Sequence, residues 1–160
     1  ELRPLVIELR DAFREANKTS GIQGDRMSYI EEMLEEILKL VYREYREIVE
    51  IERLTCELEE TLNHSDRKSA NLILEMRQYE MERVSQAKRA ISELLESMDD
   101  DLKNDIKRLL EGEQLSERKE SEAERISMIS RQRNHTMENI RRIDRALSRR
   151  VAGKDSYYEE

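Results

Sequence analysis

The chain has 160 residues and a net charge of −8 at pH 7, with 41% charged and 37% hydrophobic residues. This acidic balance argues against general affinity for nucleic acids or anionic membranes, because neutralising phosphates requires clustered cations. Four glycines, one proline and no tryptophan are typical of long helices with narrow apolar stripes. Such stripes suit a two- or three-stranded bundle, in which each helix buries only a seam.

The sequence also bears on the compartment. It contains no run of about 20 apolar residues, so no membrane span is predicted. Its first residues show no signal-peptide core. The single Cys56 excludes an internal disulfide framework and suits a reducing environment. We therefore predict a cytoplasmic protein in which Cys56 is a small buried residue on a helix.

The first predicted element is a short N-terminal helix over residues 1–18, with Pro4 in its first turn, where the missing N–H is not needed. The stretch KTSGIQGD, with two glycines in four residues, is the clearest break in the chain. A long helical hairpin over residues 25–112 is predicted to follow. A capping-box pattern from Ser28 to Glu31 marks its start.

The first arm of the hairpin carries a seam of apolar residues at steps of three and four. The seam residues are Ile30, Leu34, Ile37, Val41, Tyr45, Ile48, Ile51, Leu54, Leu58 and Leu62. They predict a helix roughly 50 Å long, which needs a partner of similar length. Asn63, Ser65 and Asp66 favour caps, so we predict the turn near residues 63–66. No Gly or Pro enforces a reversal, and one continuous helix is the alternative.

The second arm continues the helical spacing from Ile73 to Leu109. Within it, SMDDDLKND either starts a new helix with Asp99 as its cap or lies exposed on an unbroken helix. Gly112 is the predicted end of this arm. A third long helix is predicted over residues 115–151, followed by a flexible tail over residues 152–160.

The third helix carries arginines on the side away from its seam. Arg131, Arg142, Arg145 and Arg149 fall on one face at 100° per residue. The segment from residue 121 to 151 has a charge of +4, and the one from 31 to 62 has −7. We predict a solvated basic face that complements the acidic helix and helps to select pairing. Nucleic-acid binding is the weaker interpretation, because the helix lacks aromatic residues for stacking before its tail.

Two polar residues interrupt the apolar side of the third helix. Arg133 projects onto it and Asp144 lies at its edge. They can specify the helix register, or the Arg133 stem can snorkel. The functional alternative is that this face is not permanently buried. Met81 and Met128 also lie off their stripes and are candidates for a binding face.

The residues that chemistry needs are not arranged for it. Neither His64 nor His135 has a Glu three residues before it, as di-iron bundles require. The stretch DDDLKND lacks the central Gly and final Glu of a calcium loop, and no phosphate-binding loop or nucleophile elbow appears. We predict no enzyme activity, no metal and no cofactor.

The stretch EIERLTCELEETLNHSDRKSANLILEMRQYEMERVSQAKRAISELL resembles the long helical hairpin of FlgN-type flagellar export chaperones. In that comparison Leu62 to Asp66 is the turn, and RQRNHTMENI begins the interrupted stripe of the third helix. The resemblance implies a cytoplasmic, ATP-independent chaperone that holds an amphipathic helix of a flagellar client until export.

A partner helix would lie along the stripe of the third helix, as in helix-in-groove recognition. The predicted partner-binding residues, with Arg133 pairing a client carboxylate, are Ile126, Ile129, Arg133, Met137, Ile140 and Leu147. The predicted fold is all-α, an elongated antiparallel coiled-coil-like bundle of three long helices with the short N-terminal helix. The alternative function is a coiled-coil scaffold subunit that forms a homodimer or joins a larger assembly.

Overall fold

The computed structural model describes residues 21–114 and 121–159, with the side chains of residues 25–114 and 121–151. These residues form helices and no strand, so the all-α prediction is confirmed. The helices are α2 (Gly21–Asn63), α3 (Arg67–Glu96), α4 (Asp100–Leu110) and α5 (Glu122–Glu159). The helix predicted over residues 1–18 lies outside the described part of the chain.

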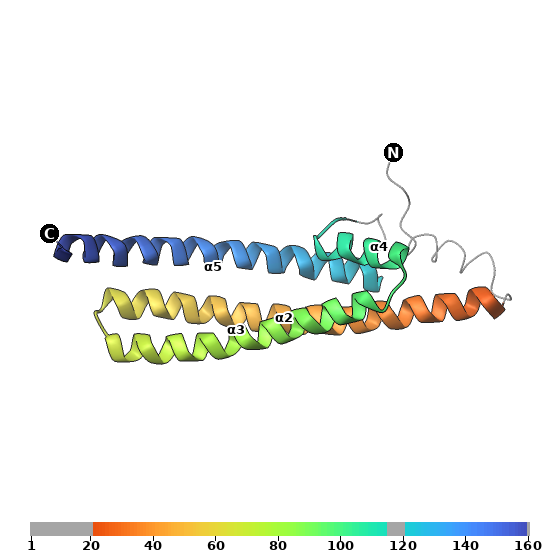
Figure 1. The fold of residues 1–160 in the computed structure, drawn as a ribbon, viewed down its shortest axis with the longest axis horizontal. Coiled ribbons are helices and arrows are strands. Elements are labelled where there is room, and N and C mark those ends of the chain that lie inside the picture. The colour runs from red at the N-terminus through yellow and green to blue at the C-terminus, as the bar shows by residue number, and fades with distance from the viewer. Residues whose placement is uncertain (1–20, 115–120, 160) are drawn as a thin grey trace.

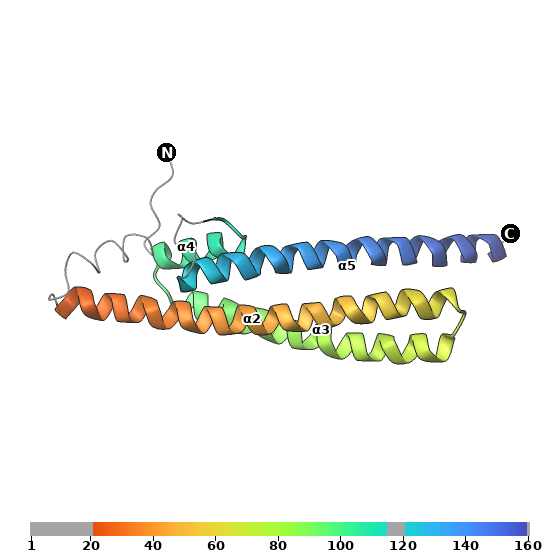
Figure 2. The same ribbon diagram turned by 180° about the vertical axis from the view of Figure 1, so that it is seen from behind.

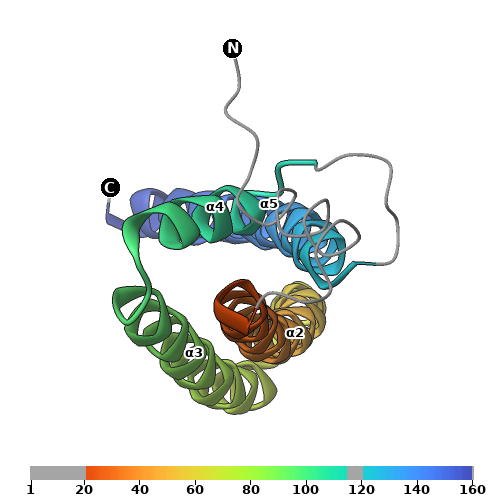
Figure 3. The same ribbon diagram turned by 90° about the vertical axis from the view of Figure 1, so that its right-hand side faces the viewer.

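Helix α2 is the centre of the arrangement. α3 and α5 each pack along it, whereas α4 packs mainly on α5. The three long helices lie along the long axis of the molecule (Figures 1 and 2), and the end view shows α3 and α5 on different sides of α2 (Figure 3). α3 runs opposite to α2, while α4 and α5 run in the same direction as α2.

Helix α2 begins before the predicted capping box. Its helical backbone starts at Gly21, so Ser28 lies inside the helix and the predicted start there is wrong. A glycine inside a helix costs only about 1 kcal/mol, which a long buried seam offsets. Of the ten predicted seam residues, eight are buried, and Tyr45 and Leu62 are partly buried.

The chain reverses direction between α2 and α3, so the continuous-helix alternative is wrong. Ser65 adopts a left-handed backbone conformation with φ of 57°. Asp66 caps α3, because its carboxylate accepts a hydrogen bond from the backbone N–H of Ser69 at 3.1 Å. Hydrogen bonds from the Ser69 side chain and backbone lower the pKa of Asp66.

A second break separates α3 from α4. Asp99 caps α4 by accepting a hydrogen bond from the backbone N–H of Leu102 at 3.0 Å, and it forms an ion pair with Arg26 of α2 at 2.5 Å. The hydrogen bond from Arg26 is the main reason why the pKa of Asp99 is lowered. SMDDDLKND therefore starts a new helix. The hairpin predicted over residues 25–112 consists of three helices in the structure, because its second arm divides into α3 and α4.

The last helix extends further than predicted. α5 continues through Gly153 to Glu159, where we expected a flexible tail over residues 152–160. No proline follows Val151, and Gly153 alone weakens a helix without forcing its end. None of the described helices is long and apolar enough to span a membrane.

The described side chains form three buried apolar clusters along the bundle. The largest draws residues from all four helices, including Leu34, Ile91, Ile106 and Ile126. The other two draw on α2, α3 and α5 alone, around Ile48 and around Leu54. We call these two parts of the molecule the four-helix end and the three-helix end.

Candidate protein-binding groove

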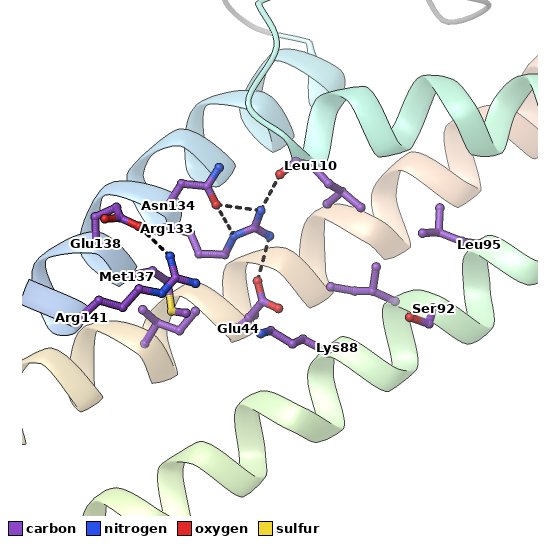
Figure 4. A pocket seen from close by; sticks show the side chains of 12 residues that line it. Glu44, Lys88, Ser92, Leu95, Leu110, Arg133, Asn134, Met137, Glu138 and Arg141 are labelled. Atoms are coloured by element: carbon purple, nitrogen blue, oxygen red, sulfur yellow. Dashed lines mark hydrogen bonds and ion pairs between the residues drawn. The ribbon is translucent and has the colours of Figure 1, made fainter. Parts of the chain in front are cut away.

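The first interruption of the α5 seam is an ion pair inside the molecule. Arg133 contacts the Glu44 carboxylate at 2.9 Å, and Glu44 is only 2% exposed. A second guanidinium nitrogen of Arg133 donates to the backbone carbonyl of Leu110 at the end of α4. Figure 4 shows Arg133 between these two acceptors. Arg133 thus joins α5 to α2 and α4 through contacts inside the molecule, whereas we predicted that it pairs a client carboxylate.

The second interruption links α5 to α3. Asp144 forms an ion pair with Arg77, whose side chain is 14% exposed. The Arg77 Nε lies buried without a hydrogen-bond partner. Because α3 and α5 otherwise approach each other sparsely among the described residues, this pair is a rare direct link between them.

A groove separates α3 from α5. The groove begins at Leu110, where α4 ends. At the four-helix end, Leu102, Ile106 and Leu109 of α4 are fully buried. Beyond Leu110 a hollow of about 470 Å³ opens between the two long helices, with Glu44 and Ile48 of α2 contributing to its lining (Figure 4). A second hollow of about 930 Å³ follows at the three-helix end. We call these two hollows together the α3–α5 groove.

The walls of the groove recur at helical spacing on both sides. On α3 the wall includes Leu74, Arg77, Lys88, Ile91 and Leu95. On α5 it includes Met137, Arg141, Asp144, Ser148 and Val151. Most of these residues are three or four positions apart, and Arg77 and Lys88 are eleven apart, which is about three helical turns. Each set therefore lies on one side of its helix. Both hollows lie along the same side of the bundle, between α3 and α5, and the Arg77–Asp144 pair joins the two helices there.

Several large apolar side chains of the groove face solvent. Leu74 is 45% exposed, Val151 is also exposed, and Met137 is half-buried. Met81 is exposed too and lies on the same side of α3, between the two hollows. Apolar residues gathered along one hollow differ from singly scattered surface residues, which need no explanation.

The structure divides the six predicted partner-binding residues. Ile126 and Ile129 lie in the cluster of the four-helix end, and Ile140 lies in a three-helix cluster. They contact the molecule's own helices, so the prediction of an open stripe there is wrong. Met137 and Leu147 do line the groove, although Leu147 is mostly buried.

Sequence reasoning missed the α3 wall. Leu74 and Leu95 were not predicted, because the only interruption of an apolar stripe that pointed to binding was on the third helix. The signal was present in Leu74 and Met81, which are apolar residues beside the seam of α3 rather than on it. Met81 was a candidate for a binding face, with a core or filler role as the default interpretation, and the structure places it exposed on the groove side of α3.

The basic face of α5 points mainly to solvent. Arg142, Arg145 and Arg149 are exposed, and Arg142 donates a hydrogen bond to Asn139 of its own helix. The ion pair between α5 and Glu44 of the acidic α2 is formed by Arg133, which lies on the apolar side of α5. The predicted complementarity between an acidic and a basic helix is thus met from the seam rather than from the basic face.

A second apolar strip lies on the outer side of α3. Leu72, Met76 and Tyr79 are all exposed and border a shallow hollow of about 310 Å³ with Glu50 and Leu54 of α2. Their spacing of four and three residues places them on one face. We call these three residues the outer strip.

Cys56 is exposed, which corrects the prediction that it is buried. Partial burial, with the Glu52 and Glu59 carboxylates nearby, raises the pKa of its thiol. A thiol with a raised pKa is less reactive, because the thiolate is the nucleophile. The described residues also hold no group of three or more His, Cys, Asp or Glu side chains that could bind a metal ion.

Comparison with protein-family models, curated proteins and solved structures finds no match to this chain. No relative therefore supplies a function or a set of site residues. The geometry of the groove and the chemistry of its walls are the basis for a functional assignment.

Proposed function

We propose that the chain is a non-enzymatic protein-binding module whose α3–α5 groove takes up an amphipathic helix of a protein partner. One observation carries the proposal. α4 packs its apolar side into the bundle at one end, and beyond Leu110 the space between α3 and α5 is an open hollow lined by apolar side chains, such as Leu95 and Met137, together with charged ones. A partner helix would extend the four-helix packing along the molecule.

The physical basis is the burial of apolar surface. Each side chain that a partner removes from water contributes about 25 cal/mol per Å² of apolar area. Leu74, Met81 and Val151 retain much of their surface in this structure. A helix with apolar residues at steps of three and four would cover them, as in other helix-in-groove complexes.

The narrower form of the proposal is a cytoplasmic export chaperone. A groove that shields an amphipathic helix would keep that segment from aggregating before it reaches its own assembly. This is the role implied by the resemblance to FlgN-type chaperones, whose client is a flagellar protein. We propose this role together with the groove, which stands independently of it.

Substitutions on opposite sides of α3 test the groove. Leu74→Glu places a charge in the groove, whereas the matched control Leu72→Glu places it on the outer strip. Both leucines are exposed, at 45% and 58%, so both variants should fold. A protein partner identified by affinity capture and then purified should bind Leu72→Glu normally and Leu74→Glu at least tenfold more weakly. Equal binding to both variants would contradict the proposal.

The outer strip favours a second candidate, a coiled-coil scaffold that pairs with another copy. Leu72, Met76 and Tyr79 form an apolar strip suited to a symmetric contact. Sedimentation velocity would then show a dimer that Leu72→Glu dissociates and Leu74→Glu leaves intact. A monomer at all concentrations would exclude this candidate.

A further inference from the structure

The α3–α5 groove is electropositive in an acidic chain. Five cationic and three anionic side chains line its two hollows, a net charge of +2 where the whole chain carries −8. Each anion already pairs with an arginine of the groove: Glu44 with Arg133, Glu138 with Arg141, and Asp144 with Arg77. The groove therefore offers no unpaired carboxylate to a basic ligand.

Two groove cations have no ion-pair partner among the described residues. Lys88 lines the hollow next to α4, and Arg67 lines the hollow at the three-helix end. Both side chains are exposed, so a ligand can reach them. Their positions at opposite ends of the groove let both contact a single helix.

Arg77 lies between them and has unused hydrogen-bonding capacity. A guanidinium has five N–H donors, and the buried Nε of Arg77 has no partner beside the Asp144 pair. Arginine binds carboxylates best through two parallel hydrogen bonds. Because the Nε is buried, a second carboxylate that enters the groove can reach only the exposed part of the Arg77 side chain, which is 14% of its surface.

We infer that the occupant of the groove is an acidic amphipathic helix, whose apolar side covers Leu74 and Met81 and whose carboxylates pair with Arg67, Arg77 and Lys88. This inference rests on the proposed function. It adds the charge of the partner helix, which the apolar residues of the groove do not determine.

The spacing of the cations defines the expected ligand pattern. Arg67, Arg77 and Lys88 are separated by ten and eleven residues, or roughly 15 Å along α3. Because eleven residues complete three helical turns, acidic residues on one flank of the partner should recur about every three turns. The wall from Arg67 to Leu95 spans roughly 40 Å, enough for a partner helix of about seven turns.

Three designed peptides of about seven turns test the inference. They share one apolar stripe of leucines and differ on its flank, which carries Glu, Gln or Lys at the positions facing α3. Fluorescence anisotropy at low ionic strength should show the Glu peptide binding about tenfold more tightly than the Lys peptide. Added salt should reduce that difference, because the paired groups are partly exposed.

Paired variants locate the origin of the preference. Arg67→Gln with Lys88→Gln should remove most of the discrimination between the Glu and Lys peptides, leaving the part that Arg77 contributes. Neither Arg67 nor Lys88 has an ion pair among the described residues to lose. The matched control, Lys68→Gln with Arg89→Gln, changes exposed cations that do not line the groove. It should leave the discrimination unchanged.

The outcomes separate this inference from the proposed function. Equal binding of the three peptides, lost on Leu74→Glu, would overturn the acidic partner and retain the groove. A preference for the Lys peptide would do the same. If none of the peptides binds, the proposed function falls together with the inference. A dimer that Leu74→Glu dissociates would place a second copy in the groove and overturn the acidic partner.

Discussion

The two ends of the bundle are built from the same long helices but are packed differently. At the four-helix end, α4 covers the space between α3 and α5, and thirteen buried residues form one cluster. At the three-helix end no described helix occupies that space, and the buried apolar residues divide into two small clusters. The difference shows that a large buried cluster forms where a fourth helix packs on the long helices, and that the seams of the long helices alone form smaller clusters.

Buried polar groups occur at both ends of the bundle. Asp105, Ser127 and Ser130 are buried at the four-helix end. Glu44, Glu47 and Thr55 of α2 are buried around the boundaries of the small clusters. At the three-helix end, the Arg77–Asp144 ion pair joins α3 to α5. Buried polar groups therefore do not distinguish the two ends, and the difference between them is the presence of α4 in only one cluster.

Core truncations should measure the contrast between the ends most directly. Leu109→Ala, in α4, should lower the free energy of unfolding by about 4 kcal/mol, because Leu109 is fully buried among four helices. Leu147→Ala, at the edge of the groove, should lower it by only about 2 kcal/mol. Urea denaturation followed by circular dichroism gives both values. Equal losses would mean that the two ends are packed equally well.

The Glu44–Arg133 pair marks the boundary between the ends. Glu44→Ala should cost about 3 kcal/mol of unfolding free energy, because it leaves the Arg133 charge without its carboxylate in a mostly buried position. The double variant Glu44→Leu with Arg133→Leu should recover most of that loss, since it removes both charges. A double variant as unstable as the single one would show that the pair itself stabilises the fold.

Gly112 tests how the end of α4 is held at the four-helix end. Its φ is +88°, and an added Cβ would lie 2.6 Å from the Cγ of Arg131. Gly112→Ala should therefore cost about 1–2 kcal/mol of unfolding free energy, from the left-handed backbone and the displaced arginine stem. Thermal unfolding monitored by circular dichroism measures it. An unchanged melting temperature would contradict this account of the turn.

Asp99 gives the smallest expected effect and a test by pH. Asp99→Ala should cost about 1 kcal/mol of unfolding free energy through the lost cap of α4, and Asp99→Asn should cost less because the amide oxygen still accepts the Leu102 N–H. The folded-state pKa of Asp99 lies below its ordinary value of 3.8. The stabilisation is thus present above pH 3.8 and is lost as the pH falls through the lowered value.

Unfolding of wild type and Asp99→Asn over a range of acidic pH values checks the sign. The stability difference between the two proteins should shrink as the pH falls below 3.8, because the wild-type carboxylate becomes protonated. A difference that grew in acid would contradict the lowered pKa. Exposed groups elsewhere titrate in both proteins and cancel in the comparison.

Much of the fold was readable from local pattern. The apolar steps from Ile30 to Leu62 predicted a buried seam, and eight of its ten residues are buried. Asp66 was predicted to favour a cap, and a cap at Asp99 was one of two alternatives, because short acidic side chains satisfy backbone N–H groups at helix starts. Both residues are caps in the structure. The start at Ser28 was wrong, since the same pattern can lie inside a helix that packing extends.

The position of the candidate groove was less predictable from the sequence. The helical spacing correctly predicted that Ile126, Ile140 and Leu147 lie on the side of α5 that avoids water. All three are buried against the molecule's own helices. Arg133 looked like an unpaired cation, and its partner Glu44 lies 89 residues away along the chain. A pattern of one helix reports which side avoids water but contains no information on what covers that side.

Helical content, seam positions and helix caps thus follow from residues close together in the chain, because hydrogen bonds and side-chain spacing in a helix are local. The open groove depends instead on where α4 packs. Its eleven residues are too few to cover the full length between α3 and α5, so the chain closes one end of the bundle and leaves the other open. That outcome arises from contacts between distant segments.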